Sequence, residues 1–339
     1  MILFSDLHLC EDSADTVFNE VLPCLEAATV KYQDSELACL GDFWHVRYKV
    51  PVVLQNQVHS WLFGLRIRGI TLRLLPGNHD QVNVAGENAL QVFQGLKGVS
   101  IYTEAAWDKD GFWIPYRQDL KVIENILQNS KCEPGSPMVL FIHHGIRGAM
   151  MNGNKLDTEG LSVGLLSQFQ KIFCGHYHRR QYFGKNLLYV GSPYQTKADE
   201  TGQEKGFTVW KRDSNFLENV TARWGKRYHN IVVSAYKQGD IPLDLSAVDI
   251  KRDEVRVLTK VGVNAEKVGK ALINMGVLSH IVTPEVESSE NRLLVGANAT
   301  LTQFARAYVG EKAVGAEGEA DNLWRVFEEI AGKLVGVSS

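Results

Sequence analysis

Five short apolar segments of the sequence each end in a cluster of acidic, amide or imidazole side chains. The clusters read D-L-H at 6–8, G-D-F-W-H at 41–45, G-N-H-D at 77–80, H-H at 143–144 and G-H-Y-H at 175–178. Oxygen and nitrogen donors of these types are the usual ligands of divalent metal ions in proteins. Seven of them are our candidate metal ligands: Asp6, His8, Asp42, Asn78, His143, His176 and His178.

This donor set predicts a site for two divalent cations. Hard oxygen ligands mixed with neutral imidazoles suit manganese, iron or zinc, and the lack of a thiolate among the candidates argues against a purely structural zinc site. Two cations about 3.5–4 Å apart need roughly this many ligands, with one carboxylate shared between them. Such pairs usually hydrolyse phosphate esters, because they lower the pKa of bound water and neutralise charge on the reacting phosphate.

Each cluster taken singly has an ordinary structural interpretation. An Asn-His pair is common in turns, and the D-x-H and G-H-x-H segments can be a plain strand end and a surface loop. The occurrence of all five clusters together favours a shared site, because every cluster follows directly after an apolar segment.

The segments that precede the clusters are typical of buried strands. Short apolar runs alternate with helical spacing through the first 210 residues, which predicts an α/β fold with sheets layered between helices. Sheets of this kind carry their sites on the loops beyond the carboxyl ends of strands, where the clusters lie. We expect strands at 2–5, 37–40, 70–75, 139–142, 172–174, 187–190 and 207–210.

The character of the sequence changes after about residue 222. A small α/β module follows, then a polar stretch and two amphipathic helices. The last helix has an apolar stripe that either packs on the chain itself or binds a partner. We therefore divide the chain into a core domain at 1–221, a small α/β capping domain at 222–285, a linker at 286–298 and a C-terminal helical segment at 299–339.

The composition excludes several classes of protein. With 339 residues, 45% hydrophobic content and a net charge of −3, the chain has ample material for a core and is not disordered. No run approaches the roughly 20 apolar residues of a membrane span, and the N-terminus lacks a signal-peptide pattern. The five cysteines are scattered and odd in number, so we expect no disulfide framework and a reducing cytoplasm.

The near-neutral charge provides no global attraction for nucleic acid. Contact with DNA would therefore need a local patch, for which basic residues on the expected loops are candidates. The alternative for these residues is an ordinary solvated rim. The candidates are Arg47, Lys49, Arg147, Lys155, Arg179 and Arg180.

The order of the clusters resembles the calcineurin-like metallophosphoesterase superfamily. Its details are most similar to the SbcD branch, the nuclease subunits of double-strand-break repair complexes, which include phage recombination exonuclease subunits. As in that branch, His45 follows Asp42 at the spacing G-D-x-x-H, and Gly-Ser-Pro at 191–193 follows the last cluster by one strand. The resemblance is specific over about 1–210, loose over 222–285 and only architectural after 299.

The resemblance implies how the seven candidate ligands are shared between two cations. It assigns three residues to each cation and one residue to both. One cation would be held by Asp6, His8 and His178, the other by Asn78, His143 and His176, with Asp42 as the bridge.

The resemblance also implies three catalytic residues outside the ligand set. His79 would contact the scissile phosphate and assist departure of the leaving oxygen, and Asp80 would orient or charge His79. His45 would lie near the phosphate and help to place the strand or protonate the leaving group, although a hydrogen-bonded loop histidine is the alternative. We expect His144 to be structural, because each strand end usually supplies one ligand, and Tyr177 to pack away from the metals.

The activity that the resemblance implies is a manganese-dependent DNA nuclease, in which a metal-bound hydroxide hydrolyses the phosphodiester. It would be an exonuclease on double-stranded DNA and an endonuclease on single strands, in DNA end processing and recombination. An SbcC-type coiled-coil ATPase would bind the helices at 299–339. Two copies would pair through early helices, for which an apolar face is offered by residues that could equally belong to the core: Trp61, Leu62, Phe63 and Leu65. We expect a cytoplasmic location, which is the host cytoplasm if the protein is phage-encoded.

Two alternatives remain open. The first is another phosphoesterase of the same fold, either a protein phosphatase or a small-molecule phosphodiesterase. Phosphatases typically follow the bridging aspartate with a V-D-R-G-like segment, where this chain reads F-W-H-V-R. The second is a catalytically inactive scaffold of the same fold, against which the complete ligand set argues.

Overall fold

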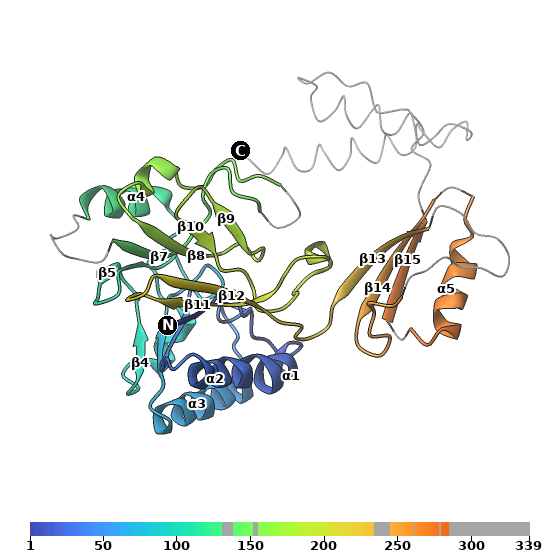
Figure 1. Ribbon diagram of the computed structural model, residues 1–339, viewed down its shortest axis with the longest axis horizontal. Coiled ribbons are helices and arrows are strands. Elements are labelled where there is room, and N and C mark those ends of the chain that lie inside the picture. The colour runs from blue at the N-terminus through green and yellow to red at the C-terminus, as the bar shows by residue number, and fades with distance from the viewer. Residues whose placement is uncertain (131–137, 152–154, 234–244, 261, 278, 285–339) are drawn as a thin grey trace, which may run out of the picture. The chain divides into compact units, whose positions relative to one another are not determined.

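The computed structural model is a mixed α/β fold with two large sheets and one small sheet (Figure 1). It describes residues 1–130, 138–151, 155–233, 245–260, 262–277 and 279–284. The predicted α/β class with layered sheets is confirmed. The linker expected at 286–298 and the helical segment expected at 299–339 lie outside the described residues.

The first six-stranded sheet supplies three of the five strand ends. Its strands are β1 (Ile2–Phe4), β2 (Glu36–Cys39), β3 (Thr71–Leu74), β4 (Val99–Ile101), β11 (Gly206–Lys211) and β12 (Phe216–Thr221). Their order is β12-β11-β1-β2-β3-β4, and β1 to β4 are parallel. The carboxyl ends of β1, β2 and β3 therefore meet at one edge of this sheet.

The second six-stranded sheet supplies the other two strand ends. Its strands are β5 (Ala106–Trp107), β6 (Phe112–Ile114), β7 (Val139–His143), β8 (Lys171–Gly175), β9 (Gln181–Phe183) and β10 (Leu187–Tyr189). Their order is β5-β6-β7-β8-β10-β9, and β6, β7, β8 and β10 are parallel. The last residue of β7 is itself a candidate ligand, His143.

The two sheets pack face to face through a shared apolar layer. In β1, Leu3 belongs to this layer, whereas Ile2 and Phe4 belong to the cluster that contains the helices. Trp113 and Phe141 of the second sheet stack in the same layer, with ring centroids 4.0 Å apart. Burial on both faces explains why the strands read as continuous apolar runs in the sequence.

Helices cover the outer face of each sheet (Figure 1). The first sheet is covered by α2 (Leu22–Lys31) and α3 (Val52–Ile67), and the second by α4 (Leu120–Asn129). The Asp119 side chain caps α4 by accepting a hydrogen bond from the backbone N–H of Lys121. Short helical turns occur at α1 (Ala14–Thr16), η1 (Val17–Val21), η2 (Ala89–Phe93), η3 (Val163–Leu166) and η4 (Ala198–Glu200).

A small three-stranded parallel sheet and one helix follow the sandwich. They comprise β13 (Tyr228–Val233), β14 (Glu254–Thr259), β15 (Ser279–Pro284) and α5 (Ala265–Asn274). This module has an apolar cluster of its own, in which Val268 and Leu272 of α5 pack with Val255 and Val257 of β14. Residues 1–284 together form one compact unit.

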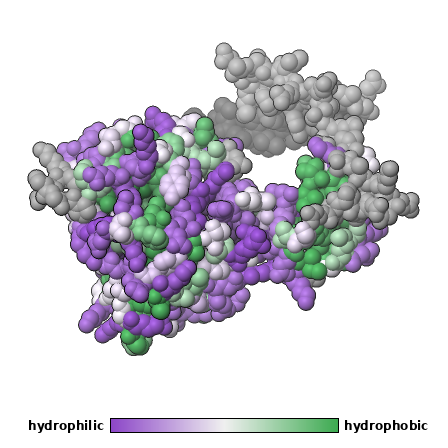
Figure 2. Space-filling view, viewed as in Figure 1, coloured by the Kyte–Doolittle hydropathy of each residue, from purple (hydrophilic) through white to green (hydrophobic). Residues whose placement is uncertain are grey.

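The apolar face that we expected at 61–65 for pairing of two copies is mostly internal. Trp61, Leu62 and Leu65 are buried in the core against the first sheet, and Phe63 of this set is exposed. In Figure 2 the side of the sandwich turned to the viewer is mainly hydrophilic, with small separate hydrophobic patches. Within the described part of the chain, every helix is too short or too polar to span a bilayer.

Gly41 lies where the first sheet approaches a ligand from the second sheet. Its φ is +103°, and a Cβ atom there would lie 2.0 Å from Nδ1 of His143. We expect Gly41→Ala to lower the free energy of unfolding by about 2 kcal/mol or more, from left-handed strain and overpacking together. Gly69→Ala is the matched control, because Gly69 also has a positive φ but no atom near the added methyl. Equal losses for the two variants in urea unfolding would contradict the close approach.

Candidate metal centre

The loops after β1 and β2 are joined by backbone hydrogen bonds that bring their candidate ligands together. The N–H of Asp6 donates to the carbonyl of Gly41, and the N–H of His8 donates to the carbonyl of Asp42, both at 2.9 Å. The second sheet joins the same site, because the backbone N–H of His176 donates to the Asp6 carboxylate at 3.2 Å. Strand ends from both sheets thus converge on one place.

Four of the candidate ligands have a backbone conformation that residues other than glycine rarely adopt. The φ angles are 53° at Asp6, 47° at His8, 51° at Asp42 and 89° at His176. Such residues cost of order 1–3 kcal/mol each and persist only where the surrounding structure holds them. Here each one turns the chain sharply out of its strand, and their concentration in one place is typical of a functional site.

The first group of ligand atoms comes from Asp6, His8 and His178. One ligand atom from each of the three buried side chains lies within 4.8 Å of the others. The Nε2 atoms of His8 and His178 face each other at 3.0 Å, and Nε2 of His178 is 4.0 Å from Oδ1 of Asp6. Ligand atoms about 2.1 Å from one cation lie roughly 3–3.5 Å from each other, so these separations suit a shared ion.

The second group comes from Asp42, His143 and His176, with Asn78 between them. The Oδ1 atom of Asn78 is 3.2 Å from Nε2 of His143 and 2.8 Å from Nδ1 of His176. One ligand atom from each of Asp42, His143 and His176 also lies within 4.8 Å of the others. The structure thus brings all seven candidate ligands together, and a ligand atom of His8 also lies within 4.8 Å of ligand atoms of His45 and His79.

Asp42 connects the two groups. Its Oδ2 atom is 3.7 Å from Nε2 of His8, and its Oδ1 atom is 3.5 Å from Nε2 of His143. Oδ1 also accepts a hydrogen bond from the backbone N–H of His79 at 2.7 Å. Space for this carboxylate depends on Gly77, where a Cβ atom would lie 2.2 Å from Oδ1. One oxygen on each side is the arrangement that a bridging carboxylate requires.

The donor set fits divalent cations because imidazole nitrogens and an amide oxygen direct lone pairs into the site. Nδ1–H of His143 donates to the carbonyl of Leu40 at 2.6 Å, so in the neutral ring Nε2 presents its lone pair to Asn78 Oδ1. Nδ1–H of His178 donates to Oε1 of Glu200 at 2.6 Å, so Nε2 presents its lone pair to His8. The contact of His143 with Asn78 is unfavourable unless a proton or a metal ion lies between the two atoms, whereas Nε2–H of His8 can donate to the His178 lone pair when no metal is bound.

The pKa values of the ligands reflect the same need for positive charge. Burial lowers the pKa of His8, and burial together with the His143 charge lowers the pKa of His176 to about 3. Burial also opposes protonation of His143, but the Asp42 and Asp6 carboxylates outweigh it and raise the pKa of His143 to about 9. Positive charge is therefore favoured beside Asp42, whether a proton or a metal ion supplies it.

His79 and His45 lie at the open side of the ligand groups. Their rings stack with centroids 5.5 Å apart, and the His79 Nδ1–H donates to the carbonyl of His45 at 2.9 Å. His45 is exposed and its Nδ1 is 3.2 Å from Nδ1 of His8, so it contacts a candidate ligand directly. The cavity that contains Asp42, Asn78 and His176 is also lined by both rings.

Asp80 has partners other than His79. Its carboxylate is fully buried and accepts hydrogen bonds from three backbone N–H groups, those of Phe43, Trp44 and Gly77, at 2.8–3.2 Å. These bonds connect the loop after β2 to the loop after β3. The orienting role toward the His79 ring that we expected for Asp80 therefore has no contact to support it among the described atoms, and Asp80 instead holds two ligand-bearing loops together.

Several neighbouring residues have structural roles. Tyr177 packs in the core of the second sheet, as predicted, and its hydroxyl group donates a hydrogen bond to Oδ2 of Asp157 at 2.5 Å. His144 is buried, with Nε2 3.1 Å from the carbonyl of Arg117. Of the basic candidates, Arg180 binds the backbone carbonyls of three strands rather than lining the site, whereas Arg47 lines a cavity together with Asn78.

Glu200 and Lys205 support the site and have no recognisable signal in the sequence. Glu200 is fully buried in η4 and accepts the His178 Nδ1–H, while its second oxygen pairs with Nζ of Lys205 at 2.7 Å. Lys205 also donates to the backbone carbonyl of His178 at 2.9 Å. A carboxylate behind a metal-binding imidazole fixes the ring and its tautomer. Neither residue follows an apolar run, so strand-end reasoning does not find them.

Comparison with known proteins finds similarity to solved structures only. No protein-family model matches the chain, and no curated protein matches it. The chain is similar to the crystal structure of the Pseudomonas putida nuclease MPE at 15% identity and a TM-score of 0.28, over 61% of this chain and 82% of that one. This similarity is too weak to carry an argument, so the interpretation of the site rests on its own geometry.

We expect Asp80→Asn to destabilise the fold. An amide group in place of the carboxylate turns its NH₂ toward at least one of the three backbone donors, which leaves buried N–H groups without an acceptor. The expected loss is about 2–3 kcal/mol, measured by urea unfolding. Asp199→Asn, at an exposed position, is the control and should change little. Unchanged stability of Asp80→Asn would show that this carboxylate does not hold the loops.

We expect Glu200→Gln to weaken metal binding about 10- to 100-fold, because it removes the negative charge that orients His178. The measurement is titration of Mn²⁺ into the full chain by calorimetry, with near-UV circular dichroism to verify folding. Glu204→Gln is the matched control, since Glu204 lies four residues away and is exposed. Wild-type affinity in a folded Glu200→Gln variant would remove Glu200 from the metal centre.

Proposed function

We propose that this protein is a metal-dependent nuclease that hydrolyses phosphodiester bonds in DNA at a dinuclear centre. The observation that carries the proposal is the position of Asp42, with one carboxylate oxygen toward each of two groups of ligand atoms. Such an arrangement is characteristic of centres that hold two cations against one phosphate. The order of the ligand clusters along the sequence supports a phosphoesterase of the calcineurin-like type.

The chain's own residues would divide the chemistry between them. Asp6, His8 and His178 would hold one cation, with Asn78, His143 and His176 holding the other and Asp42 shared. When bound, the cations would supply positive charge that activates a water molecule and stabilises the reacting phosphate. The strained backbone at Asp6, His8, Asp42 and His176 keeps these side chains in position before any substrate arrives.

His79 is suited to move a proton to the leaving oxygen. Because its Nδ1–H is held by the carbonyl of His45, the Nε2 atom is the one that gains and loses a proton. In the displacement, water attacks phosphorus and loses a proton, the bond to the leaving oxygen breaks, and Nε2–H of His79 protonates that oxygen. The proton lost by the water then restores Nε2–H of His79. His45, stacked on His79 and in contact with His8, would position both rings.

The finer parts of the proposal rest on the motif resemblance. These are manganese as the metal, exonuclease action on duplex DNA and endonuclease action on single strands, and a role in DNA end processing and recombination. They also include an SbcC-type coiled-coil ATPase bound by residues 299–339, and pairing of two copies of the chain.

The test combines metal content with activity. Elemental analysis after incubation with Mn²⁺ should give two ions per chain for the wild type and one or none for Asp42→Ala. His79→Ala should keep both ions but lose about 10²- to 10⁴-fold in hydrolysis of linear duplex DNA and of bis-(p-nitrophenyl) phosphate.

Three outcomes would contradict parts of this proposal. Absence of bound metal at saturating Mn²⁺ would exclude the dinuclear centre. Hydrolysis of the small diester without any digestion of DNA would favour the alternative of a small-molecule phosphodiesterase. Full activity of His79→Ala would remove that residue from the mechanism.

A further inference from the structure

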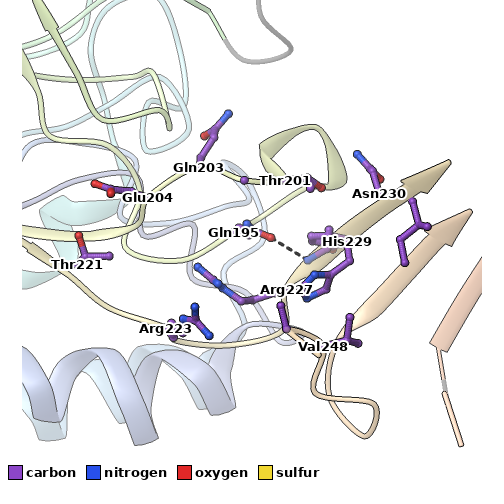
Figure 3. A pocket seen from close by; sticks show the side chains of 14 residues that line it. Gln195, Thr201, Gln203, Glu204, Thr221, Arg223, Arg227, His229, Asn230 and Val248 are labelled. Atoms are coloured by element: carbon purple, nitrogen blue, oxygen red, sulfur yellow. Dashed lines mark hydrogen bonds between the residues drawn. The ribbon is translucent and has the colours of Figure 1, made fainter. Parts of the chain in front are cut away.

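A second cavity lies beside the candidate metal centre and contains none of its ligands (Figure 3). Most of its lining residues are of polar types, and two of them, Arg223 and Arg227, lie next to one another in Figure 3. Side-chain amides and hydroxyls surround them, from Gln195, Thr201, Gln203 and Thr221.

Among the described residues, neither guanidinium is joined to a carboxylate by an ion pair or a side-chain hydrogen bond. Burial and the Arg223 charge lower the pKa of Arg227, and the Asp253 carboxylate opposes this effect. Glu204 is the acidic side chain of the lining, and His229 is already paired with Asp253 at 2.8 Å.

The segment that carries the arginines is anchored to the sandwich. Trp224 is buried and stacks on Phe207 of β11, with ring centroids 6.1 Å apart. The backbone N–H of Gly225 donates to Glu20 at 3.2 Å, and the backbone N–H of Tyr228 donates to Gln195 at 2.8 Å. The fold therefore fixes the backbone on either side of both arginines, with Arg223 exposed and Arg227 partly buried.

A continuous row of residues connects this cavity to the candidate metal centre. Thr196 and Lys197 line the cavity that contains Asp42 and His79, and Gln195 lines the cavity of the two arginines. A third hollow, lined by both Gln195 and Thr196, lies between the two. At about 3.5 Å per residue, the three consecutive residues span roughly 10 Å, which is within reach of a neighbouring nucleotide.

We propose that the cavity of Arg223 and Arg227 binds backbone phosphate of a polynucleotide strand, next to the phosphodiester being cleaved. Guanidinium groups bind phosphate oxygens through paired, charge-assisted hydrogen bonds. The hollow between the two cavities is lined by Tyr228 and Lys226, where Lys226 pairs with Glu254 at 3.2 Å and its Nζ lies 4.8 Å from the centre of the Tyr228 ring. This inference rests on the proposed nuclease function. It gives the site a contact that a polynucleotide can make and a small phosphodiester cannot.

The test compares two substrates in the full-length, Mn²⁺-loaded protein. Arg223→Ala and Arg227→Ala should each raise KM for a single-stranded oligonucleotide about tenfold with little change in kcat. Both should leave hydrolysis of bis-(p-nitrophenyl) phosphate unchanged, because that diester is too short to reach the cavity. The slope of log KM against log salt should fall by about 0.7 for each variant, as one phosphate contact is lost.

Arg66→Ala is the matched control, since it removes one exposed positive charge on α3 away from these cavities. If the arginine variants cleave the oligonucleotide with wild-type KM and salt slope, the proposal is wrong while the nuclease function stands. If the wild type cleaves neither substrate, the nuclease function itself fails. If inorganic phosphate binds the wild type but not the variants, and oligonucleotide KM is unchanged, the cavity is a free-anion site and the proposal is overturned.

Discussion

The buried negative charge of Asp42 is the feature on which the site depends. A carboxylate removed from water is costly unless positive charge or hydrogen-bond donors replace its hydration. Asp42 receives one backbone N–H, and its other neighbours are the imidazoles of His8 and His143. In its neutral form each of His143 and His178 donates its single proton to Leu40 or Glu200, and the raised pKa of His143 shows that Asp42 favours an added positive charge beside it.

The sandwich supplies the rigidity that this concentration of lone pairs requires. Two sheets packed through a shared aromatic layer bring strand ends from residues more than 160 positions apart to one edge. The left-handed backbone conformation at four candidate ligands is unfavourable locally, so it persists only because hydrogen bonds join the neighbouring loops. Asp80 makes such a connection, because its single buried carboxylate accepts hydrogen bonds from three backbone N–H groups.

The segment from residue 194 to residue 205 links the parts of the site. Tyr194 donates its hydroxyl hydrogen bond to the carbonyl of Leu7 at 2.6 Å, so this segment is fixed to the loop that carries two ligands. Glu200 and Lys205 hold the ring and the backbone of His178. Gln195 of the same segment lines the cavity of the two arginines. One stretch of chain therefore both orients His178 and lines the cavity that we propose for a neighbouring phosphate.

Local signals in the sequence were sufficient for seven strands of the two large sheets and for the ligand clusters. Each of these predicted strands overlaps an observed one. The strands β4, β5, β6 and β9, which have only two or three residues each, were not predicted, and neither was β12, which reads F-L-E-N-V-T, is partly exposed and lacks a continuous apolar run. The clusters were recognisable because a strand that ends at a site must be followed at once by its functional residues. Tertiary structure decided which side chains meet: it gave Asp80 backbone partners, placed Arg180 against carbonyls, and brought Glu200 behind His178. These contacts depend on packing between segments that are distant in the chain. The periodicity of a sequence indicates which side chains are buried and which face of an element they share, but it does not indicate which distant residue they will contact.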